Sequence, residues 1–264
     1  MKLVIKLSYL GTRFHGSQIQ PNQRTVTGVL KEVLREVYGA DCTVCGCSRT
    51  DAGVHAKEYY MMADFTASDA VPLPVPLSRA PMVLNNFLPE DVSVLDVFYP
   101  AEGFHPRFSA VAKEYRYLIR NSRVKDPFLY RRALLYKRPL DEKLLDAAAA
   151  DFLGTHDFTA FMAQGSDVST TQRTVHYARV TREGDGDDVV FTVCADGFLY
   201  NMVRIMTGTL LYIAEGKIPA DGIPHIIASK DRARAGVNVP PHGLYLSRVD
   251  YGTVPIRRDE TAQN

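Results

Sequence analysis

The segment from Ser48 to Ala56 concentrates residue types that can carry chemistry. It reads Ser-Arg-Thr-Asp-Ala-Gly-Val-His-Ala and lies between two stretches with strand character. Asp51 is open to three interpretations there. Asp-Ala-Gly can form a tight turn in which the carboxylate bonds its own backbone, or the carboxylate can act as a nucleophile or base if arginines keep it ionised. A phosphoryl-accepting aspartate is disfavoured, because such sites carry a second acid two residues on for magnesium, and Gly53 stands there.

Nearby arginines could keep such a carboxylate charged. A guanidinium within about 4–6 Å lowers a carboxyl pKa by about 1–3 pH units, and arginine suits this role because its charge is permanent and its fork is planar. For Arg204 the residues themselves raise only the question of burial, because it lies among Met202, Val203, Ile205 and Met206. Such a helical turn should be buried, and a buried arginine needs a partner. The alternative is an exposed arginine on a helix.

Hydrophobic patterns predict the elements that must position these residues. Alternation at period two predicts strands, and apolar residues three and four apart predict helices. The patterns give strands over 2–9, 41–47, 58–65, 92–98, 113–119, 174–182, 188–195 and 244–251, and helices over 26–37, 78–87, 140–154 and 201–215. This order lacks the tight βαβ rhythm of a parallel sheet. We therefore expect an α+β fold with a largely antiparallel sheet, in two halves over 1–103 and 104–264.

The composition is that of a globular protein. The 264 residues are 46% hydrophobic and 23% charged, which are ordinary values. A chain of this length buries about 70–75% of its unfolded surface, so it needs no metal or disulfide to fold. No apolar run approaches about 18 residues and no secretory signal is present. We therefore expect a cytoplasmic protein.

Charge is nearly balanced, with 31 Lys+Arg against 30 Asp+Glu. This excludes a uniformly basic surface but not a local basic patch. The stretch from Arg120 to Arg138 holds seven basic residues and one acid, interleaved with Phe128, Tyr130 and Tyr136. A solvated surface run is one interpretation. The other, which we favour, is contact with the phosphate backbone of a nucleic acid.

Three cysteines lie close together at Cys42, Cys45 and Cys47 and could supply metal ligands. The segment has strand character, however, so Cys45 and Cys47 should face one side and Cys42 the other. No second closely spaced Cys/His pair completes a site. We expect reduced, mostly buried thiols here and at Cys194.

Motifs along nearly the whole chain resemble the TruA family of tRNA pseudouridine synthases. The segment around Asp51 is similar to the signature loop of that family, usually Gly-Arg-Thr-Asp-Ala-Gly-Val-His. Other matching segments, in family order, are Tyr9–Gln18, Leu84–Pro89, Phe104–Ala110 with Lys113–Tyr117, Asp157–Phe161, Phe198–Arg204 and Gly243–Leu246. One such string would be weak evidence, whereas several in order make a specific match.

The resemblance implies an enzyme that isomerises uridine to pseudouridine in tRNA without a cofactor or metal. The base is detached at its glycosidic nitrogen, rotated and reattached through C5. The family's nucleophilic aspartate corresponds to Asp51, which either attacks C6 of the base or assists its departure from the sugar. Tyr115 corresponds to the tyrosine that binds the uracil and can help to remove the C5 proton. Arg204 corresponds to the arginine that pairs with the aspartate.

Two further arginines are expected to bind the RNA. The target base must be turned out of its stack, and Arg49 corresponds to the arginine that helps to hold the vacated space. The alternative for Arg49 is a structural link to the backbone of its own loop. Arg107, in the Phe104–Ala110 motif, is expected to bind substrate as well.

The implied fold has two α/β halves, each somewhat like an RNA-recognition module, with a shared mixed sheet and a central cleft. The implied partners are the anticodon arm of tRNA, at positions 38 to 40, and a second copy of the chain, with neither DNA nor a membrane involved. The rival is a non-catalytic RNA-binding or tRNA-folding module, which would lack one of the three catalytic side chains. Two departures from the family, Ser48 for Gly and Ser17 for an aromatic residue before Gln18, concern loop packing and target range.

Overall fold

The computed structural model describes residues 1–66, 68, 75–165, 168–184, 186–252 and 256–257. The chain divides into two compact units, one formed by Met1–Val111 with the segment from Leu246 onward and the other by Ala112–Tyr245. The boundary predicted after residue 103 stays a prediction. In the structure the first unit extends to Val111, and the chain rejoins this unit at Leu246. In the described part of the chain, no helix is long and apolar enough to cross a membrane.

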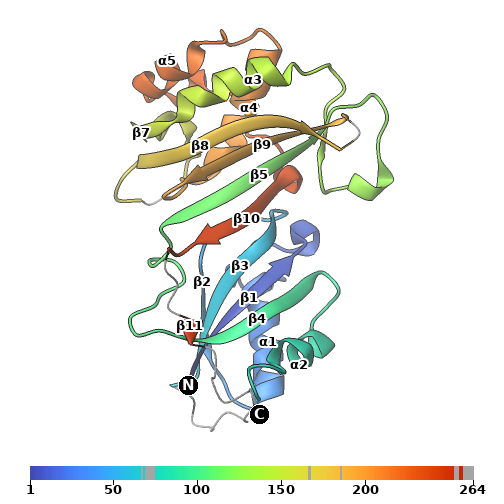
Figure 1. Cartoon of the computed structure of the whole chain (residues 1–264), viewed down its shortest axis with the longest axis vertical. Helices are drawn as coiled ribbons and strands as arrows, with labels where there is room; N and C mark the ends of the chain where they lie inside the picture. Colours follow the sequence, from blue (N-terminus) through green and yellow to red (C-terminus); the bar gives the residue numbers. More distant parts are fainter. Residues whose placement is uncertain (67, 69–74, 166–167, 185, 253–255, 258–264) are drawn as a thin grey trace. The chain divides into compact units, whose positions relative to one another are not determined.

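The first unit is built on a sheet (Figure 1). Its strands follow the order β11 (Ile256–Arg257), β4 (Val92–Pro100), β1 (Lys2–Tyr9), β3 (His55–Asp64) and β10 (Leu244–Asp250), with β2 (Thr43–Gly46) paired to β3 off this path. α1 (Val26–Tyr38) contacts β2 and α2 (Ala80–Phe87), and α2 packs on β4. Buried apolar side chains from α1 and the strands form the core, including Ile5, Leu7, Leu30 and Leu34.

The second unit has its own strands and helices. Its strands follow the order β5 (Ala112–Arg120), β9 (Asp188–Ala195), β8 (Gln172–Glu183) and β7 (Gly154–Asp157), and β6 (Leu134–Leu135) pairs with β5. Its helices are α3 (Glu142–Ala149), which packs on β8, α4 (Met202–Ala214), which contacts α3 and β5, and α5 (Gly222–Ser229). Fully buried aromatic rings fill the core, among them Tyr117, Phe152, Phe161 and Phe191.

The predicted class is confirmed. Within the units, the pairings of β1 with β3 and β4, of β9 with β5 and β8, and of β7 with β8 are all antiparallel, whereas β5 and β6 pair in parallel. The helix predicted over 26–37 is α1, which begins at the cap Thr25 and ends at Gly39 in the left-handed conformation. The strand predicted over 2–9 is β1.

The sequence patterns did not predict α5 and β7, nor the two-residue strands β6 and β11. α5 is short and carries Pro224 in its first turn, where proline is tolerated because the early N–H groups lack helical partners. β7 begins at Gly154, which we expected to end the preceding helix. That helix ends at Ala149 and a 3-10 turn follows to Phe152, so Gly154, with φ of 97°, starts a strand instead.

Candidate active site

The loop that carries Asp51 is held by the segment that precedes α1. Gly53 N–H donates to the Phe14 carbonyl (3.2 Å), and Ser17 N–H donates to the Thr50 carbonyl (3.1 Å). Thr50 also shares a 2.7 Å hydrogen bond between its hydroxyl and that of Tyr9. Asp51 itself is half-buried, and its carbonyl accepts the Val54 N–H to close the turn. The turn expected at Asp-Ala-Gly is therefore present, and hydrogen bonds from other segments of the chain hold it in place.

Glycines make this close contact between the two segments possible. A Cβ on Gly11 would lie 1.9 Å from the Val54 carbonyl oxygen, and one on Gly16 would lie 2.6 Å from that of Thr50. Gly16 also has φ of 89°, in the region that other residues rarely adopt. Gly11 N–H donates to Nδ1 of the fully buried His55 (2.9 Å), which gives this histidine a structural role.

Both departures from the family motif lie in this contact. The Ser17 hydroxyl accepts the Thr50 N–H (3.0 Å) and donates to the Ser48 carbonyl (3.3 Å). The Tyr59 hydroxyl donates to the same Ser48 carbonyl. The small side chain at position 17 thus provides polar bonds to the loop in place of an aromatic contact.

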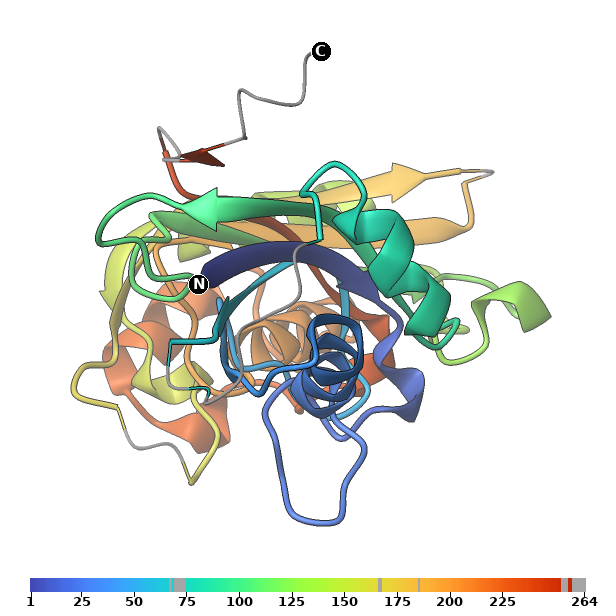
Figure 2. The same ribbon diagram turned by 90° about the horizontal axis from the view of Figure 1, so that it is seen from below.

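A buried carboxylate anchors the segment before α1 at both ends. Asp91 accepts two hydrogen bonds from Arg24 (2.8 and 2.9 Å) and one from Arg13 (2.9 Å). Burial raises the pKa of Asp91, but the bonds and charges of the two arginines outweigh this and hold it below the ordinary value. Between these anchors the chain makes the long loop drawn in blue beside α1 in Figure 2.

A hollow of about 410 Å³ lies beside the signature loop within the first unit. We call it the Arg49–Arg107 hollow. The residues around it are Ser17, Gln18, Ile19, Thr27, Val44, Cys45, Gly46, Ser48, Arg49, Tyr59, His105, Arg107 and Phe108. The structure therefore brings both predicted substrate-binding arginines, Arg49 and Arg107, to one cavity.

Tyr115 lies on β5 of the second unit, where it is opposite Val193 of β9. Its side chain is buried, and its ring meets that of Phe198 edge-on at 5.0 Å between centroids. An aromatic neighbour at this distance fixes the plane of the tyrosine ring.

Arg204 lies in the first turn of α4, and two hydrogen bonds orient its guanidinium. Nε donates to the Val239 carbonyl (2.7 Å) and Nη1 donates to Oδ1 of Asn201 (2.6 Å). Asn201 stands at the start of the helix with φ of 59°. Burial raises the pKa of Tyr117, and the nearby charge of Arg204 opposes this rise. The pKa of His242 is lowered mainly by burial, with the charges of Arg131 and Arg204 adding to the effect.

The bond to Val239 depends on a close crossing of two backbones. A Cβ on Gly208 of α4 would lie 1.9 Å from the Val237 carbonyl oxygen, and one on Gly236 would lie 2.3 Å from the Gly208 carbonyl carbon. The Tyr117 hydroxyl holds the end of the same segment through the Pro240 carbonyl (2.7 Å). Residues 236–240 are therefore pressed against α4 beside Arg204.

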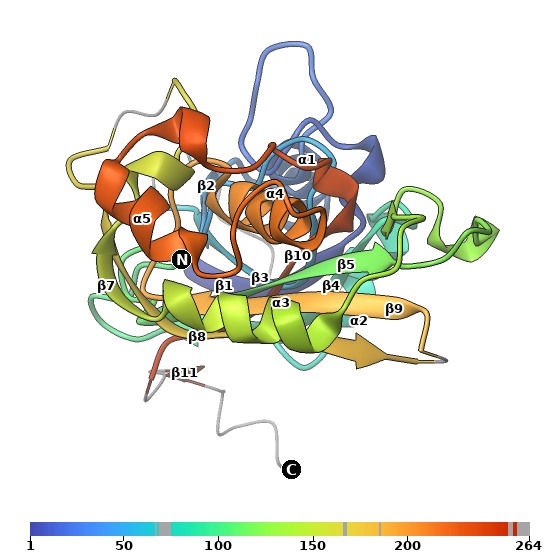
Figure 3. The ribbon, with the colours of Figure 1, turned by 90° about the horizontal axis from the view of Figure 1, so that it is seen from above.

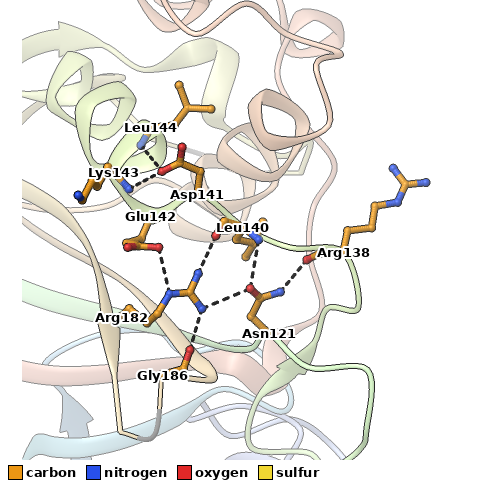
Figure 4. A network of polar contacts seen from close by, with 9 residues as sticks. All are labelled: Asn121, Arg138, Leu140, Asp141, Glu142, Lys143, Leu144, Arg182 and Gly186. Atoms are coloured by element: carbon orange, nitrogen blue, oxygen red, sulfur yellow. Dashed lines mark hydrogen bonds and ion pairs between the residues drawn. The ribbon is translucent and has the colours of Figure 1, made fainter.

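The basic stretch forms a projecting loop, residues 122–139, which we call the basic loop (Figures 1 and 3). Asn121 closes its base by donating to the Tyr136 and Arg138 carbonyls (3.1 and 2.6 Å) and accepting the Leu140 N–H (3.1 Å). Figure 4 shows Arg182 bonding the same base through the Leu140 carbonyl (2.6 Å), next to its ion pair with Glu142.

The charge excess of this stretch is smaller than its sequence suggests. Arg120 pairs with Asp187 and Asp188 (2.9 and 3.1 Å), and Arg138 lies 3.7 Å from Glu215. Arg123 and Lys125 are exposed and form no ion pair with the described residues. Phe128 and Tyr130 are 79% and 73% exposed, so the loop presents cations together with aromatic surface.

The cysteines are free thiols in the structure. Cys42, Cys47 and Cys194 are buried, and burial raises the pKa of Cys42 to about 11. Among the residues that the structure describes, no three His, Cys, Asp or Glu side chains gather as a metal site would require.

Some contacts around the site had no signal in the sequence. Nothing about Ser17 or Asp91 distinguishes a bonded side chain from an exposed one, because their partners lie more than thirty positions away. His105 and Phe108, in contrast, stand inside a recognisable motif and could have been assigned to the hollow with Arg107.

Known proteins match this chain over nearly its full length. A family model described as tRNA pseudouridine synthase matches residues 148–252. A protein named tRNA pseudouridine synthase A from Thermoanaerobacter sp. (strain X514) is 40% identical over 249 residues, covering 94% of this chain and 99% of the relative. Proteins of the same name from Halalkalibacterium halodurans and Acetivibrio thermocellus are 39% and 41% identical, covering 98% and 95% of this chain and 96% and 99% of the relatives.

Solved structures give a weaker likeness. A chain in the crystal structure of the archaeal box H/ACA sRNP Nop10-Cbf5 complex is 14% identical with a TM-score of 0.34. The match covers 93% of this chain and 48% of that chain.

Proposed function

Because the chain belongs to the tRNA pseudouridine synthase A family, we propose that it isomerises uridine to pseudouridine in the anticodon arm of tRNA, at positions 38 to 40. The observation that carries this proposal is identity of about 40% to relatives of that name over 94% or more of the chain. The fixed signature loop supports it, since catalytic groups need positions held by their surroundings.

Asp51 is the nucleophile of the proposed reaction. Its loop is bonded at Thr50 and Gly53, the residues on either side of the Asp-Ala pair. A carboxylate held in this way meets the extruded base without first ordering its own backbone, which lowers the entropic part of the barrier. Its carboxylate either attacks C6 of the base or assists the departure of the base from the sugar.

Tyr115 and Arg204 complete the proposed catalytic set. Tyr115 stacks on or beside the uracil and helps to remove the C5 proton after reattachment. Arg204 supplies the permanent positive charge that keeps the carboxylate of Asp51 ionised in a partly dry site. Support for this role comes from its two bonds to Val239 and Asn201, which fix the guanidinium within its own unit.

The RNA is bound through local cations, because the chain as a whole is almost neutral. Arg49 and Arg107 bind the RNA near the flipped base, and the basic loop contacts the phosphate backbone. Exposed Arg123 and Lys125 suit that contact, since release of counterions from phosphates drives such binding.

Two further parts of the proposal concern the oligomeric state of the protein and the compartment in which it works. We propose that the chain acts as a homodimer, with one tRNA spanning both subunits, and that it works in the cytoplasm, where tRNA and reduced thiols are both found. The molar mass measured by light scattering, alone and with tRNA, tests the dimer. A monomer of 29.4 kDa that retains full activity would remove the dimer from the proposal.

The decisive experiment maps pseudouridine in unmodified tRNA after incubation with the protein. We expect new pseudouridines within positions 38 to 40 for the native chain. Asp51→Asn should abolish turnover while tRNA binding remains, because the amide keeps the shape of the carboxylate but not its charge. Asp41→Asn, at an exposed aspartate of the same unit, is the matched control and should be fully active.

Two results would contradict the proposal in different ways. Turnover by Asp51→Asn would remove the nucleophile assignment. Tight tRNA binding by the native chain with no pseudouridine formed would favour the non-catalytic RNA-binding module on the same scaffold.

A further inference from the structure

We propose that the Arg49–Arg107 hollow binds the nucleotide next to the target uridine, with its phosphate at the two arginines and its unpaired base on the ring of Phe108. This inference rests on the proposed function and adds a second RNA-binding position to it. Three observations within the first unit carry it: the charge of the lining, an exposed ring, and the place of Arg49 in the signature loop.

The lining of the hollow is positively charged without compensation. Its thirteen residues include Arg49 and Arg107 but no Asp or Glu. Neither Arg49 nor Arg107 forms an ion pair with a described residue, and the guanidinium carbon of Arg107 lies 5.6 Å from the centroid of the Phe108 ring. Two guanidiniums that lack a carboxylate suit a phosphate, whose oxygens match their planar forks.

Phe108 offers an aromatic surface at the same place. The residue is 77% exposed, which leaves most of a large apolar ring open to solvent. One neighbour is the imidazole of His105, with the ring centroids 4.5 Å apart and the planes inclined by 31°. A ring supported in this way and open to solvent is a stacking platform for a base, which any nucleobase can use.

The backbone fixes the orientation of His105. Its Nδ1 accepts the N–H groups of Arg107 (3.1 Å) and Phe108 (3.4 Å), so the proton of the neutral imidazole lies on Nε2. Nε2–H can therefore donate to a phosphate or a base oxygen. The short segment 105–108 thus carries the guanidinium of Arg107, the Nε2–H donor of His105 and the ring of Phe108.

The place of the hollow identifies its occupant as a neighbour of the target. Arg49 stands two residues before Asp51, and two residues span at most about 7 Å. An RNA strand whose target base reaches Asp51 must therefore pass Arg49 within about one nucleotide. The volume of about 410 Å³ lies in the range of small-ligand sites, about 300–1,000 Å³, and admits a single nucleotide.

The test pairs protein variants with RNA variants in one cycle. The ligand is an anticodon stem-loop RNA that holds either a normal base or an abasic site on each side of the target in turn. For the normal RNA, Phe108→Ala should weaken binding roughly 5- to 150-fold, the range for loss of one stacked base. For the RNA that is abasic at the bound position, the same variant should change binding less than twofold.

Conservative variants separate stacking from packing. Phe108→Tyr keeps the ring and should bind as the native chain does, whereas Phe108→Leu keeps apolar bulk and should bind as Phe108→Ala does. Phe87→Ala, at a 48% exposed phenylalanine of α2 outside the hollow, is the matched control and should bind like the native chain. Arg107→Gln should lower the slope of log K against log salt by about 0.7, the contribution of one phosphate contact with a single strand.

The outcomes distinguish this inference from the proposed function. If the native chain forms pseudouridine but Phe108→Ala weakens normal and abasic RNAs equally, the stacking position does not exist and the enzyme assignment stands. If Arg107→Gln leaves the salt slope unchanged, the phosphate position is wrong. A native chain that forms no pseudouridine refutes the proposed function whatever the binding data show.

Discussion

The hydroxyl of Ser17 bonds the signature loop at two points, to Thr50 N–H and to the Ser48 carbonyl. It is buried, with 2% of its surface exposed, and Thr50 is buried as well, so the Thr50 N–H loses its acceptor if the hydroxyl is removed. The motif around Asp51 could be recognised from the sequence because its residues are contiguous. The role of Ser17 could not, since a serine in a loop has the same local signature whether its hydroxyl is exposed or bonded.

Ser17→Ala should therefore slow catalysis more than it weakens RNA binding. It leaves the Thr50 N–H buried without an acceptor, which costs about 1–3 kcal/mol, and it loosens the backbone next to Asp51. We expect kcat to fall with KM for tRNA nearly unchanged, measured with unmodified tRNA under saturating and subsaturating conditions. Thr66→Ala, which removes an exposed hydroxyl bonded to Asp64, should leave both constants as they are. An unchanged kcat in Ser17→Ala would show that the loop holds its position without this side chain.

At the scale of elements, α4 could be predicted from its apolar stripe, but the segment that crosses it could not. The contact between Gly208 and residues 236–237 joins positions about thirty residues apart, and no periodicity signals it. The crossing matters because Val239, further along that segment, accepts the hydrogen bond that orients Arg204.

Gly208→Ala is expected to displace the segment whose Val239 carbonyl orients the Arg204 guanidinium. The new Cβ would lie 1.9 Å from the Val237 carbonyl oxygen, so the backbone must move, and overpacking of this kind costs about 1–3 kcal/mol. Urea unfolding should show that loss, and turnover should fall with it. In Gly28→Ala, on α1, the added Cβ meets only the Thr25 hydroxyl at 3.0 Å, and we expect a change in stability below about 1 kcal/mol. Equal stability of the two variants would argue against a tight crossing.

Asp157 ties three elements of the second unit together and makes its stability depend on pH. It accepts from the hydroxyls of Thr159 (2.6 Å) and Thr171 (2.7 Å) and pairs with Lys230 (2.8 Å) after α5. The bond to Lys230 and those to the threonines hold the pKa of Asp157 well below its ordinary 3.8. A carboxyl with a lowered pKa in the folded state adds stability that is fully present above pH 3.8 and is lost as the pH falls below it.

We expect Asp157→Asn to be clearly less stable than the native chain at pH 7, and the difference to shrink steadily below about pH 4. Thermal unfolding of the full chain between pH 7 and pH 3 measures this. Asp151→Asn serves as the control, because Asp151 forms no ion pair with a described residue, and its difference from the native chain should be small at every pH. A gap for Asp157→Asn that stays constant with pH would show that the carboxylate charge contributes nothing.

For the whole molecule, the composition gives the net charge but does not say how the charged side chains are distributed in space. The stretch from Arg120 to Arg138 looks strongly basic in sequence, yet folding brings Asp187, Asp188 and Glu215 to its two ends. The cations of this stretch that remain available lie on the projecting part, as Arg123 and Lys125 illustrate. RNA affinity should therefore depend on a few loop residues and not on the net charge of +1.

The double variant Arg123→Gln/Lys125→Gln tests this distribution against a control with equal charge. If both residues contact duplex phosphates, the slope of log K against log salt should fall by about 1.8, and by about 1.4 if they contact single-stranded RNA. Lys143→Gln/Arg179→Gln removes the same two charges from α3 and β8 of the same unit and should leave the slope within about 0.5 of the native value. Binding of tRNA measured between 50 and 200 mM salt, roughly the range in which such slopes are resolved, distinguishes the two. Equal slopes for both double variants would mean that tRNA responds to total charge, and the basic loop would lose its assigned role in binding.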